Sequence, residues 1–260
     1  MGIVNVTPDS FSDGGRFLDV DAAVAHALAL VADGADVLDI GGESTRPRAE
    51  PVPEGVEIER VLPVIRRLVD ETEVPISIDT RKAAVAQAAI GAGAEIVNDV
   101  AGCEGDPAMV GVAAETGAGL CVMHMRGTPQ TMQENPMYTD VAAEVRCYLQ
   151  SRRDALISAG VAKERICVDP GIGFGKTYEH NLALLQNCHA LHALGCPVLV
   201  GHSRKSFLGK LLGNDEGDRT LATVGVALSL AVQGVQVLRV HDARQVREAL
   251  LAFETSGGLA

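Results

Sequence analysis

The sequence predicts an α/β protein with the (β/α)8 or TIM-barrel architecture, built as a single domain over residues 1–260. Three observations predict this class. Short runs rich in β-branched residues recur eight times, each is followed by an alanine- and leucine-rich stretch, and about 250 residues is the length that eight such units need. No linker or low-complexity segment divides the chain. A doubly wound open sheet is the alternative architecture, although it has little need of eight regular repeats.

The expected elements alternate regularly along the chain. In order, the strands read IVNV at 3–6, VLDI at 37–40, ISID at 76–79, EIVN at 95–98, LCVM at 120–123, ICVD at 166–169, VLVG at 198–201 and VLRV at 237–240. The helices are the amphipathic stretches between and after them, at 20–34, 54–71, 82–92, 107–117, 139–160, 178–194, 219–233 and 242–254. Each strand with its following helix makes one unit of the barrel.

The composition agrees with this architecture and excludes some partners. Hydrophobic residues make up 47% of the chain, aromatic residues only 3%, and there is no Trp. A core of Ala, Val, Leu and Ile suits parallel strands buried on both faces, whereas a β-sandwich is richer in aromatic residues. The net charge of −12 repels phosphate backbones and anionic lipid, so neither nucleic acid nor a membrane is an expected partner.

The cysteines and the N-terminal residues indicate a cytoplasmic protein. The six cysteines form no CxxC pair, and several lie inside apolar runs, so we expect reduced thiols in the core. The first residues lack the basic and apolar regions of a signal peptide. The most apolar window, 221–238, is interrupted by polar residues, which predicts a buried helix followed by a strand and not a membrane span.

Every expected strand ends in a polar or ionisable residue. In a barrel these ends form one ring around one mouth, where the active sites of this fold are built. Taken singly, each residue could merely start a turn or cap the next helix. In chain order the residues are Asn5, Asp39, Asp79, Asn98 with Asp99, His124, Asp169, His202 with Ser203, and Arg239 with His241.

A glycine-rich segment, DPGIGFGKT at 169–177, follows the sixth strand. It matches neither a P-loop, because only three residues separate Gly171 from Gly175, nor the dinucleotide pattern. We interpret it as a tight turn in which Asp169 faces the pocket and Phe174 supplies a flat wall for a planar ligand. A solvated glycine turn without a binding role is the alternative.

Basic residues gather after the last two strands, in GHSRKS at 201–206 and RVHD at 239–242. These two loops are the common phosphate site of the fold. Arg239 and His241, two residues apart on a strand, can both point inward and bind an anion, whereas the neighbours Arg204 and Lys205 cannot both do so. Lys205 could alternatively be a Schiff-base lysine or a surface charge.

Two further segments have both a functional and a structural interpretation. Cys188, His192 and Cys196 share one helix face together with nearby His189, but they lie far from the expected mouth, so a core-facing stripe is favoured over a metal site. The polar loops 7–15 and 41–47 follow the first two strands and are fit to close over a ligand, with plain connection as the alternative.

Along nearly its whole length the chain resembles the bacterial dihydropteroate synthase family, a group of pterin-binding barrels. Any one matching segment would be modest evidence, but together and in the family's order they are specific. The segments are GIVNVTPDSFSDGG at 2–15, LDIGGESTRP at 38–47, SIDT at 77–80, ND at 98–99, MHM at 123–125, DPGIGFGK at 169–176, SRKS at 203–206 and RVHD at 239–242.

The resemblance implies a transferase of folate biosynthesis. It would condense 6-hydroxymethyl-7,8-dihydropterin diphosphate with 4-aminobenzoate, giving 7,8-dihydropteroate and pyrophosphate. It also implies bound Mg²⁺, a homodimer and a sulfonamide target, with Phe11 and Pro47 matching the drug-sensitive type. The helix at 219–233 is a candidate dimer face, and an ordinary barrel helix is the alternative.

The resemblance also assigns roles to individual residues. Asp79, Asn98, Asp169 and Lys205 match residues that hold the pterin, with Met123 and Phe174 on its faces. Asn5, Arg239 and His241 match residues at the diphosphate, and Asn5 also matches the Mg²⁺ contact. Ser203 matches a residue near the aminobenzoate carboxylate, and Thr45 and Arg46 lie in a matching loop. The expected catalytic residues are Asp79, Lys205, Arg239 and His241.

Two other functions share this barrel. One is a paralogue that binds pterin without catalysis, but such a protein has no use for the diphosphate residues Asn5, Arg46, Arg239 and His241. The other is a methyltetrahydrofolate-dependent methyltransferase domain. The STRP loop at 44–47 and the absence of a corrinoid module in this chain favour the synthase.

Overall fold

Parallel strands form the centre of the molecule. The computed structural model describes residues 1–7, 20–45 and 49–259. Six strands pair in chain order into one parallel sheet: β1 (Gly2–Asn5), β2 (Leu38–Gly41), β3 (Ile76–Asp79), β4 (Ile96–Asp99), β5 (Gly119–Met123) and β6 (Ile166–Asp169). Two shorter strands, β7 (Leu199–Val200) and β8 (Val237–Leu238), pair in parallel with each other.

Two isolated bridges close these strands into a ring. Val168 of β6 bridges Val198, just before β7, and Gly2 of β1 bridges Val240, just after β8. At the second closure the N–H of Ile3 donates to the carbonyl of Val240 at 3.0 Å. Because the last strand returns to the first, the predicted (β/α)8 barrel is confirmed, and the doubly wound open sheet is excluded.

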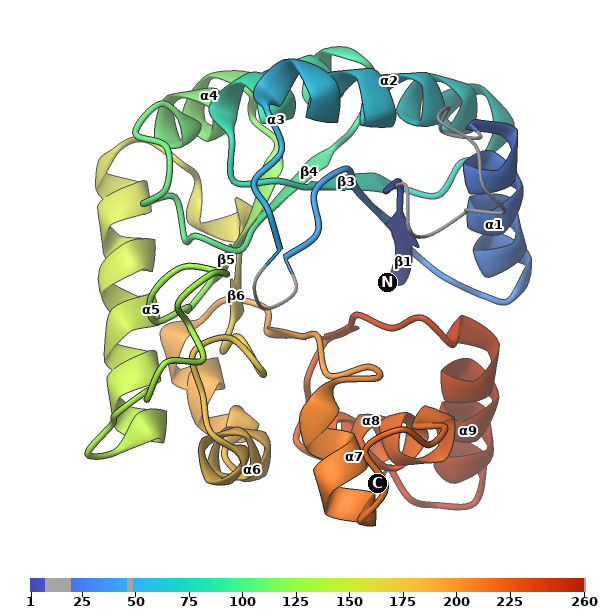
Figure 1. The fold of residues 1–260 in the computed structure, drawn as a ribbon, viewed down its shortest axis with the longest axis vertical. Coiled ribbons are helices and arrows are strands. Elements are labelled where there is room, and N and C mark those ends of the chain that lie inside the picture. The colour runs from blue at the N-terminus through green and yellow to red at the C-terminus, as the bar shows by residue number, and fades with distance from the viewer. Residues whose placement is uncertain (8–19, 46–48, 260) are drawn as a thin grey trace.

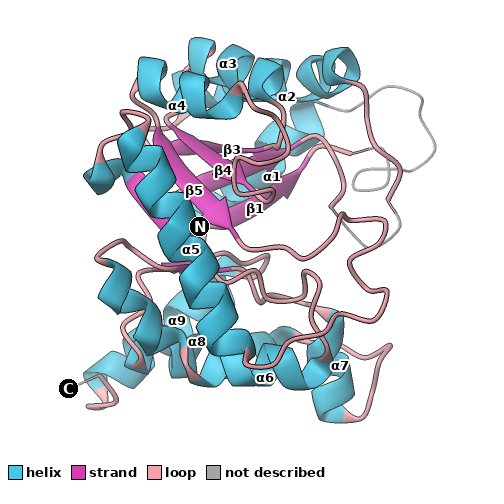
Figure 2. Cartoon of the chain, turned by 90° about the vertical axis from the view of Figure 1, so that its left-hand side faces the viewer, coloured by secondary structure: helices cyan, strands magenta, loops and turns pink. Residues whose placement is uncertain are grey.

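Helices surround the strands on the outside (Figure 1). Helix α5 packs against β5 and β6, in front of the sheet in Figure 2. The α-helices are α1 (Val20–Ala32), α2 (Glu54–Glu71), α3 (Ala83–Gly91), α4 (Met109–Thr116), α5 (Val141–Ser158), α6 (Tyr178–Gln186), α7 (Ser206–Leu212), α8 (Thr220–Val232) and α9 (Ala243–Thr255), with short 3₁₀ helices η1 (Lys163–Arg165) and η2 (Cys188–Leu194). Side-chain caps fix two starts: Asp140 accepts the Ala143 N–H before α5, and Thr177 forms a capping box with His180 before α6.

Alternation along each strand separates the outer core from the barrel interior. The outward residues are apolar, fully buried and belong to the main core beneath the helices: Val4, Ile40, Ile78, Val97, Val122, Val168 and Val200. Their neighbours on the strands point the other way, into the barrel. Three of these inward residues, Asp39, Asp79 and Asn98, are polar, so the interior is lined for a ligand near the carboxyl ends of the strands.

The last two strands are shorter than expected, with two residues each in place of four, and the structure departs from the expected α-helices in two places. The stretch 178–194 is not one helix, because it breaks at Asn187 and continues as the 3₁₀ helix η2, which Gly195 ends with a positive φ of 65°. Helix α7 was not expected, because its seven residues are too few to show a helical period and include Gly209. No helix within the described ranges is both long and apolar enough to cross a membrane.

The cysteines agree largely with the prediction of core thiols. All six are free, and Cys103, Cys121, Cys188 and Cys196 are buried, whereas Cys147 on α5 is exposed and therefore lies outside the core. His192 bonds the Gln233 carbonyl through Nε2 at 2.8 Å, and Cys188 and Cys196 lie in the main core. In the part of the chain that is described, no group of three His, Cys, Asp or Glu side chains could hold a metal ion.

Candidate active site

Arg239 lies at the centre of the barrel mouth, between two carboxylates from other strands. Its Nε donates to Oδ2 of Asp39 at 2.5 Å, and its Nη2 donates to Oδ2 of Asp79 at 2.6 Å. Asp39 is fully buried and Asp79 is 7% exposed, so both ion pairs are largely shielded from water. Strands β2, β3 and the residue after β8 therefore meet in one charged cluster, although these residues are 160 and 200 positions apart in the chain.

Asn98 at the end of β4 joins the same cluster. Its Nδ2 donates to Oδ2 of Asp39 at 3.0 Å, and the side chain is 3% exposed. Asp39 thus accepts from Arg239 and Asn98 through a single oxygen. Sequence reasoning named Asp39 only as one of the strand-end residues. Its inward position on β2 was readable from alternation, but its two partners were not.

Lys205 and Asp169 form the second charged part of the mouth. Lys205 donates to the Ile172 carbonyl, and its ammonium lies 4.4 Å from the centre of the Phe174 ring. Asp169 is 5% exposed and accepts the Gly171 N–H through Oδ1 at 2.7 Å. Lys205 points to Ile172 and Phe174, while its neighbour Arg204 turns to Asp242, so the two side chains lie in different directions, as their adjacency on the chain predicts.

Burial and neighbouring charges shift the pKa values of these groups. Burial raises the pKa of Asp79 to about 7, although Arg239 opposes this shift. Burial also raises the pKa of Asp169, against the effect of Lys205, and lowers the pKa of Lys205 to about 8. Burial lowers the pKa of Arg239, but Asp39 and Asp79 outweigh it and raise that pKa above its usual value. Such opposed pKa shifts among neighbouring groups are typical of a functional site.

Ser203 and His241 form a pair at the mouth. The Ser203 hydroxyl lies 3.0 Å from Nδ1 of His241 and accepts the backbone N–H of His241 at 3.2 Å. Ser203 is buried and His241 is partly exposed. The loops after β7 and β8 are thereby tied to each other beside Arg239.

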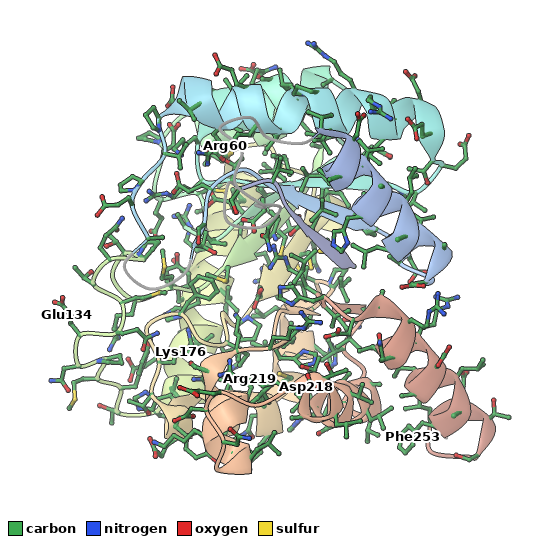
Figure 3. All side chains as sticks on the ribbon, turned by 45° about the vertical axis from the view of Figure 1, so that its right-hand side comes forward. Arg60, Glu134, Lys176, Asp218, Arg219 and Phe253 are labelled. Carbon is green, nitrogen blue, oxygen red and sulfur yellow. The ribbon has the colours of Figure 1, made fainter. Side chains whose placement is uncertain are left out.

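A buried lysine missed by sequence reasoning holds the glycine-rich loop. Lys176 is 2% exposed and contacts Nδ1 of His124 at 3.0 Å, the His124 carbonyl at 3.2 Å and the Phe174 carbonyl at 2.8 Å. Burial and Lys176 lower the pKa of His124 to about 3, which keeps that imidazole neutral. Figure 3 shows Lys176 inside the loops, inward of the exposed Glu134. The loop fits closely here, because a Cβ on Gly175 would lie 2.5 Å from the Arg126 carbonyl oxygen.

The remaining expected site residues fall into three groups. Asn5 and Thr45 are partly exposed, at the end of β1 and in the loop after β2, and Met123 is buried at the end of β5. Arg46, Phe11 and Pro47 lie outside the described residues. Two strand-end residues serve the structure instead: Asp99 accepts the N–H groups of Ala101 and Cys103, and His202 bonds the Thr223 carbonyl. For Asp99 the turn interpretation was the correct one, whereas His202 joins the strand end to α8.

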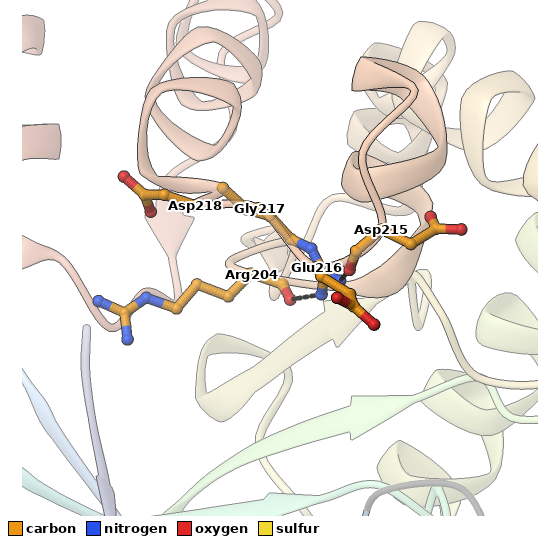
Figure 4. Close-up of a pocket in the computed structure, with 6 residues that line it drawn as sticks. Arg204, Asp215, Glu216, Gly217 and Asp218 are labelled. Carbon is orange, nitrogen blue, oxygen red and sulfur yellow. Dashed lines mark hydrogen bonds between the residues drawn. The ribbon is translucent and has the colours of Figure 1, made fainter.

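A separate shallow pocket lies between α7 and α8 (Figure 4). Asp215, Glu216 and Asp218 line it, and Nη1 of Arg219 donates to the Arg204 carbonyl at 2.9 Å. Its acidic side chains are exposed, unlike the buried charges at the mouth. This pocket therefore does not compete with the barrel mouth as the candidate active site.

Comparison with known proteins assigns the family. A family model described as pterin binding enzyme matches residues 1–241. The chain belongs to this family of pterin-binding enzymes. Among the family's curated members, the dihydropteroate synthase of Escherichia coli (strain K12) is 44% identical over 98% of this chain and 90% of its own length, and that of Mycobacterium leprae is 46% identical over 96% and 90%.

Solved structures of the family agree with the fold. A Xanthomonas albilineans dihydropteroate synthase with 4-aminobenzoic acid has a TM-score of 0.92 and 45% identity, covering all of this chain and 93% of that one. A Yersinia pestis dihydropteroate synthase in complex with a sulfonamide drug has a TM-score of 0.92 and 42% identity, covering 99% and 93%. The family resemblance that the sequence motifs indicated is therefore confirmed over nearly the whole chain.

Proposed function

We propose that this chain is a dihydropteroate synthase, which joins 6-hydroxymethyl-7,8-dihydropterin diphosphate to 4-aminobenzoate in folate biosynthesis. The observation that carries the proposal is the cluster of Arg239 with the buried residues Asp79 and Asn98 at the mouth of a pterin-family barrel. A protein that only bound pterin would not need an arginine paired with two buried carboxylates at the phosphate site of the fold. The single domain at 1–260 belongs to the same proposal.

The pterin lies at the inner end of the site in this proposal. Asp169 accepts paired N–H donors from the pterin edge, as carboxylates do from guanidinium-like groups. Asn98 and Lys205 bind the same ring system, while Met123 and Phe174 lie against its faces. The cation–π contact of Lys205 with Phe174 supports this, because it places the ammonium next to the aromatic ring against which the pterin would lie.

The diphosphate lies nearer to Arg239, His241 and Asn5. The amine nitrogen of 4-aminobenzoate forms a bond to the methylene carbon of the pterin as the bond from that carbon to the diphosphate oxygen breaks. Pyrophosphate leaves with the electron pair, and the amine loses one proton. Arg239 and His241 stabilise the charge that develops on the leaving group, and ionised Asp79 stabilises positive charge on the pterin.

Mg²⁺ is the expected cofactor, and the residues present fit it as a substrate-bound ion. Asn5, at the end of β1, offers one amide oxygen, and the described residues offer no cage of three acidic or imidazole groups. Mg²⁺ ordinarily keeps several waters and takes few protein ligands when it binds with phosphates. When bound, it would supply charge neutralisation on the diphosphate. Thr45, Arg46 and Ser203 are proposed for the aminobenzoate side, and a cytoplasmic location fits six free thiols.

The deciding experiment is pyrophosphate release from the dihydropterin diphosphate with Mg²⁺, in the presence and absence of 4-aminobenzoate. Release that depends on aminobenzoate, and that a sulfonamide inhibits competitively against it, is the expected result. Pterin binding without release would favour the non-catalytic paralogue and overturn the proposal.

The Arg239→Ala variant tests the role of the arginine in the same assay. We expect turnover to fall by about 10²-fold or more, because the leaving group loses its charge partner. Arg247→Ala is the matched control, since Arg247 is a 59% exposed arginine that pairs with Asp36 on the surface. Equal turnover in the two variants would remove Arg239 from the mechanism.

The homodimer is proposed to form through α8. This helix is apolar on nearly all sides, and Leu221 and Val232 are 84% and 61% exposed. We expect sedimentation at twice the chain mass, and a shift to the monomer for Leu221→Glu. The control is Met137→Glu, which places the same charge at a 66% exposed residue outside α8. A wild-type monomer at all concentrations would refute the dimer.

A further inference from the structure

Asp39 contacts one residue proposed for the diphosphate, Arg239, and one proposed for the pterin, Asn98. It lies on β2 inside the barrel, with no exposed surface. Its Oδ2 accepts from Nε of Arg239 at 2.5 Å and from Nδ2 of Asn98 at 3.0 Å. No expected role in substrate binding falls on Asp39 itself, since the oxygen that is hydrogen-bonded is used by Arg239 and Asn98, the two groups proposed to meet the ligand.

We infer that Asp39 is a positioning residue, which orients the Arg239 guanidinium toward the diphosphate and the Asn98 amide toward the pterin. This inference rests on the proposed function and deepens it. An arginine held by its Nε and Nη2 edges, as here by Asp39 and Asp79, has its plane fixed on two sides. Within the described residues, Nη1 makes no hydrogen bond, so this is the nitrogen left to meet a ligand.

The contact also sets which end of the Asn98 amide faces the ligand. The amide nitrogen of Asn98 is the group that points to Asp39, since it donates to Oδ2 of that residue. The amide oxygen is therefore turned away from Asp39. Asn98 then presents an acceptor, which can take a hydrogen bond from an N–H donor on the ligand.

The remaining oxygen of Asp39 argues against a purely structural role. Oδ1 is buried, and in the described part of the chain it has no hydrogen-bond partner. A buried carboxylate that leaves one oxygen unsatisfied costs stability compared with an apolar side chain of similar size. We infer that the positioning of Arg239 and Asn98 compensates for this cost in stability.

Two variants separate the hydrogen bonds from the burial. Asp39→Ala removes the acceptor of both partners, whereas Asp39→Asn keeps one oxygen that can accept from both. For Asp39→Ala we expect roughly a 10²-fold loss in kcat/KM for the dihydropterin diphosphate and weaker pterin binding by calorimetry, with the KM for 4-aminobenzoate unchanged. Asp39→Asn should restore pterin affinity to within about threefold of wild type, because it retains the acceptor.

Ser77→Ala is the matched control. Ser77 faces Asp39 across the β2–β3 ladder, is equally buried, and its hydroxyl has no partner among the described residues. We expect it to leave all constants within about twofold of wild type. Folding of each variant is checked by thermal unfolding.

The outcomes separate the inference from the function on which it rests. A wild-type chain without aminobenzoate-dependent turnover would sink the proposed function. An active wild type with Asp39→Ala at the same kcat/KM would sink the positioning role. An equal rise in KM for both substrates in Asp39→Ala would also overturn the positioning role, because it would indicate a general loss of structure and not a selective effect on the pterin substrate. If Asp39→Ala does not fold, Asp39→Leu replaces it in the test, because leucine fills the space but accepts no hydrogen bond. If Asp39→Leu then binds pterin as tightly as Asp39→Asn does, the inference is overturned.

Discussion

At the scale of single residues, the site depends on one cation shared by two buried carboxylates. Arg239 pairs with Asp39 and Asp79, and the three groups would carry a net charge of −1 if all were ionised. Burying a second carboxylate beside one cation is unfavourable, and protonation of that carboxylate relieves the cost. This is the physical reason why the pKa of Asp79 rises to about 7 while Arg239 keeps its charge.

The raised pKa predicts how Asp79 contributes to stability without ligand. A carboxyl whose pKa is raised from 3.8 to about 7 stabilises the folded chain fully below about pH 4, and that contribution is lost as the pH rises through about 7. Asp79→Asn should therefore remove part of the fall in unfolding free energy between pH 4 and pH 7. Urea unfolding at several pH values measures this difference.

Asp36→Asn is the control for that measurement, because Asp36 is 78% exposed. A pH profile for Asp79→Asn that runs parallel to the wild-type profile would show that the pKa of Asp79 is not raised in the folded chain. The same raised pKa leaves both forms of Asp79 populated near neutral pH. Positive charge that develops on the pterin should then favour the ionised form.

At the scale of elements, the sequence allowed the repeats to be located more closely than the contacts between them. The bounds of β3 and β6 agree with the expected strands, because Pro, Gly and Asp at their ends stop the apolar runs. The break at Asn187 and the short helix α7 were not predictable, since both depend on local backbone geometry that propensity does not fix. The bonds from Arg239 to Asp39 and Asp79 depend on barrel closure, which no local pattern encodes.

The loop between β6 and α6 predicts a second measurable effect. Lys176→Met removes the donor for the His124 and Phe174 carbonyls and for Nδ1 of His124. Leaving such acceptors buried and unpaired costs about 1–3 kcal/mol each, and the relief of burying an amine offsets part of this. We expect a net loss of roughly 2 kcal/mol in unfolding free energy, together with weaker pterin binding through displacement of Phe174.

Denaturant unfolding and pterin calorimetry check both parts of the Lys176 prediction. Lys163→Met is the control, because Lys163 is exposed in the short helix η1. If Lys176→Met unfolds and binds pterin as the control does, the lysine does not hold the loop. A loss of stability without a change in pterin affinity would show that the loop held by Lys176 does not contribute to pterin binding.

At the scale of the whole molecule, the barrel consists of a continuous six-stranded sheet and a two-stranded sheet, which are joined at two places by few backbone contacts. Strands β1 to β6 share continuous ladders, whereas single bridges join β6 to β7 and β8 to β1. The candidate site spans the sparse closure at β1, since Arg239 follows β8 and its two carboxylate partners lie on β2 and β3. A ligand that contacts residues on both sides of the junction between β8 and β1 would therefore add contacts where the backbone provides few.

This arrangement predicts uneven protection of backbone amides. We expect hydrogen exchange at Leu199, Val237 and Arg239 to be faster than at Ile78 and Val97, because short strands with few ladder bonds open at lower free energy. Adding a pterin with pyrophosphate should slow exchange most in β7 and β8, since a ligand that binds only the closed barrel stabilises it by mass action. Equal exchange in all eight strands, or protection confined to β3 and β4, would show that Arg239 does not couple the ligand to this closure.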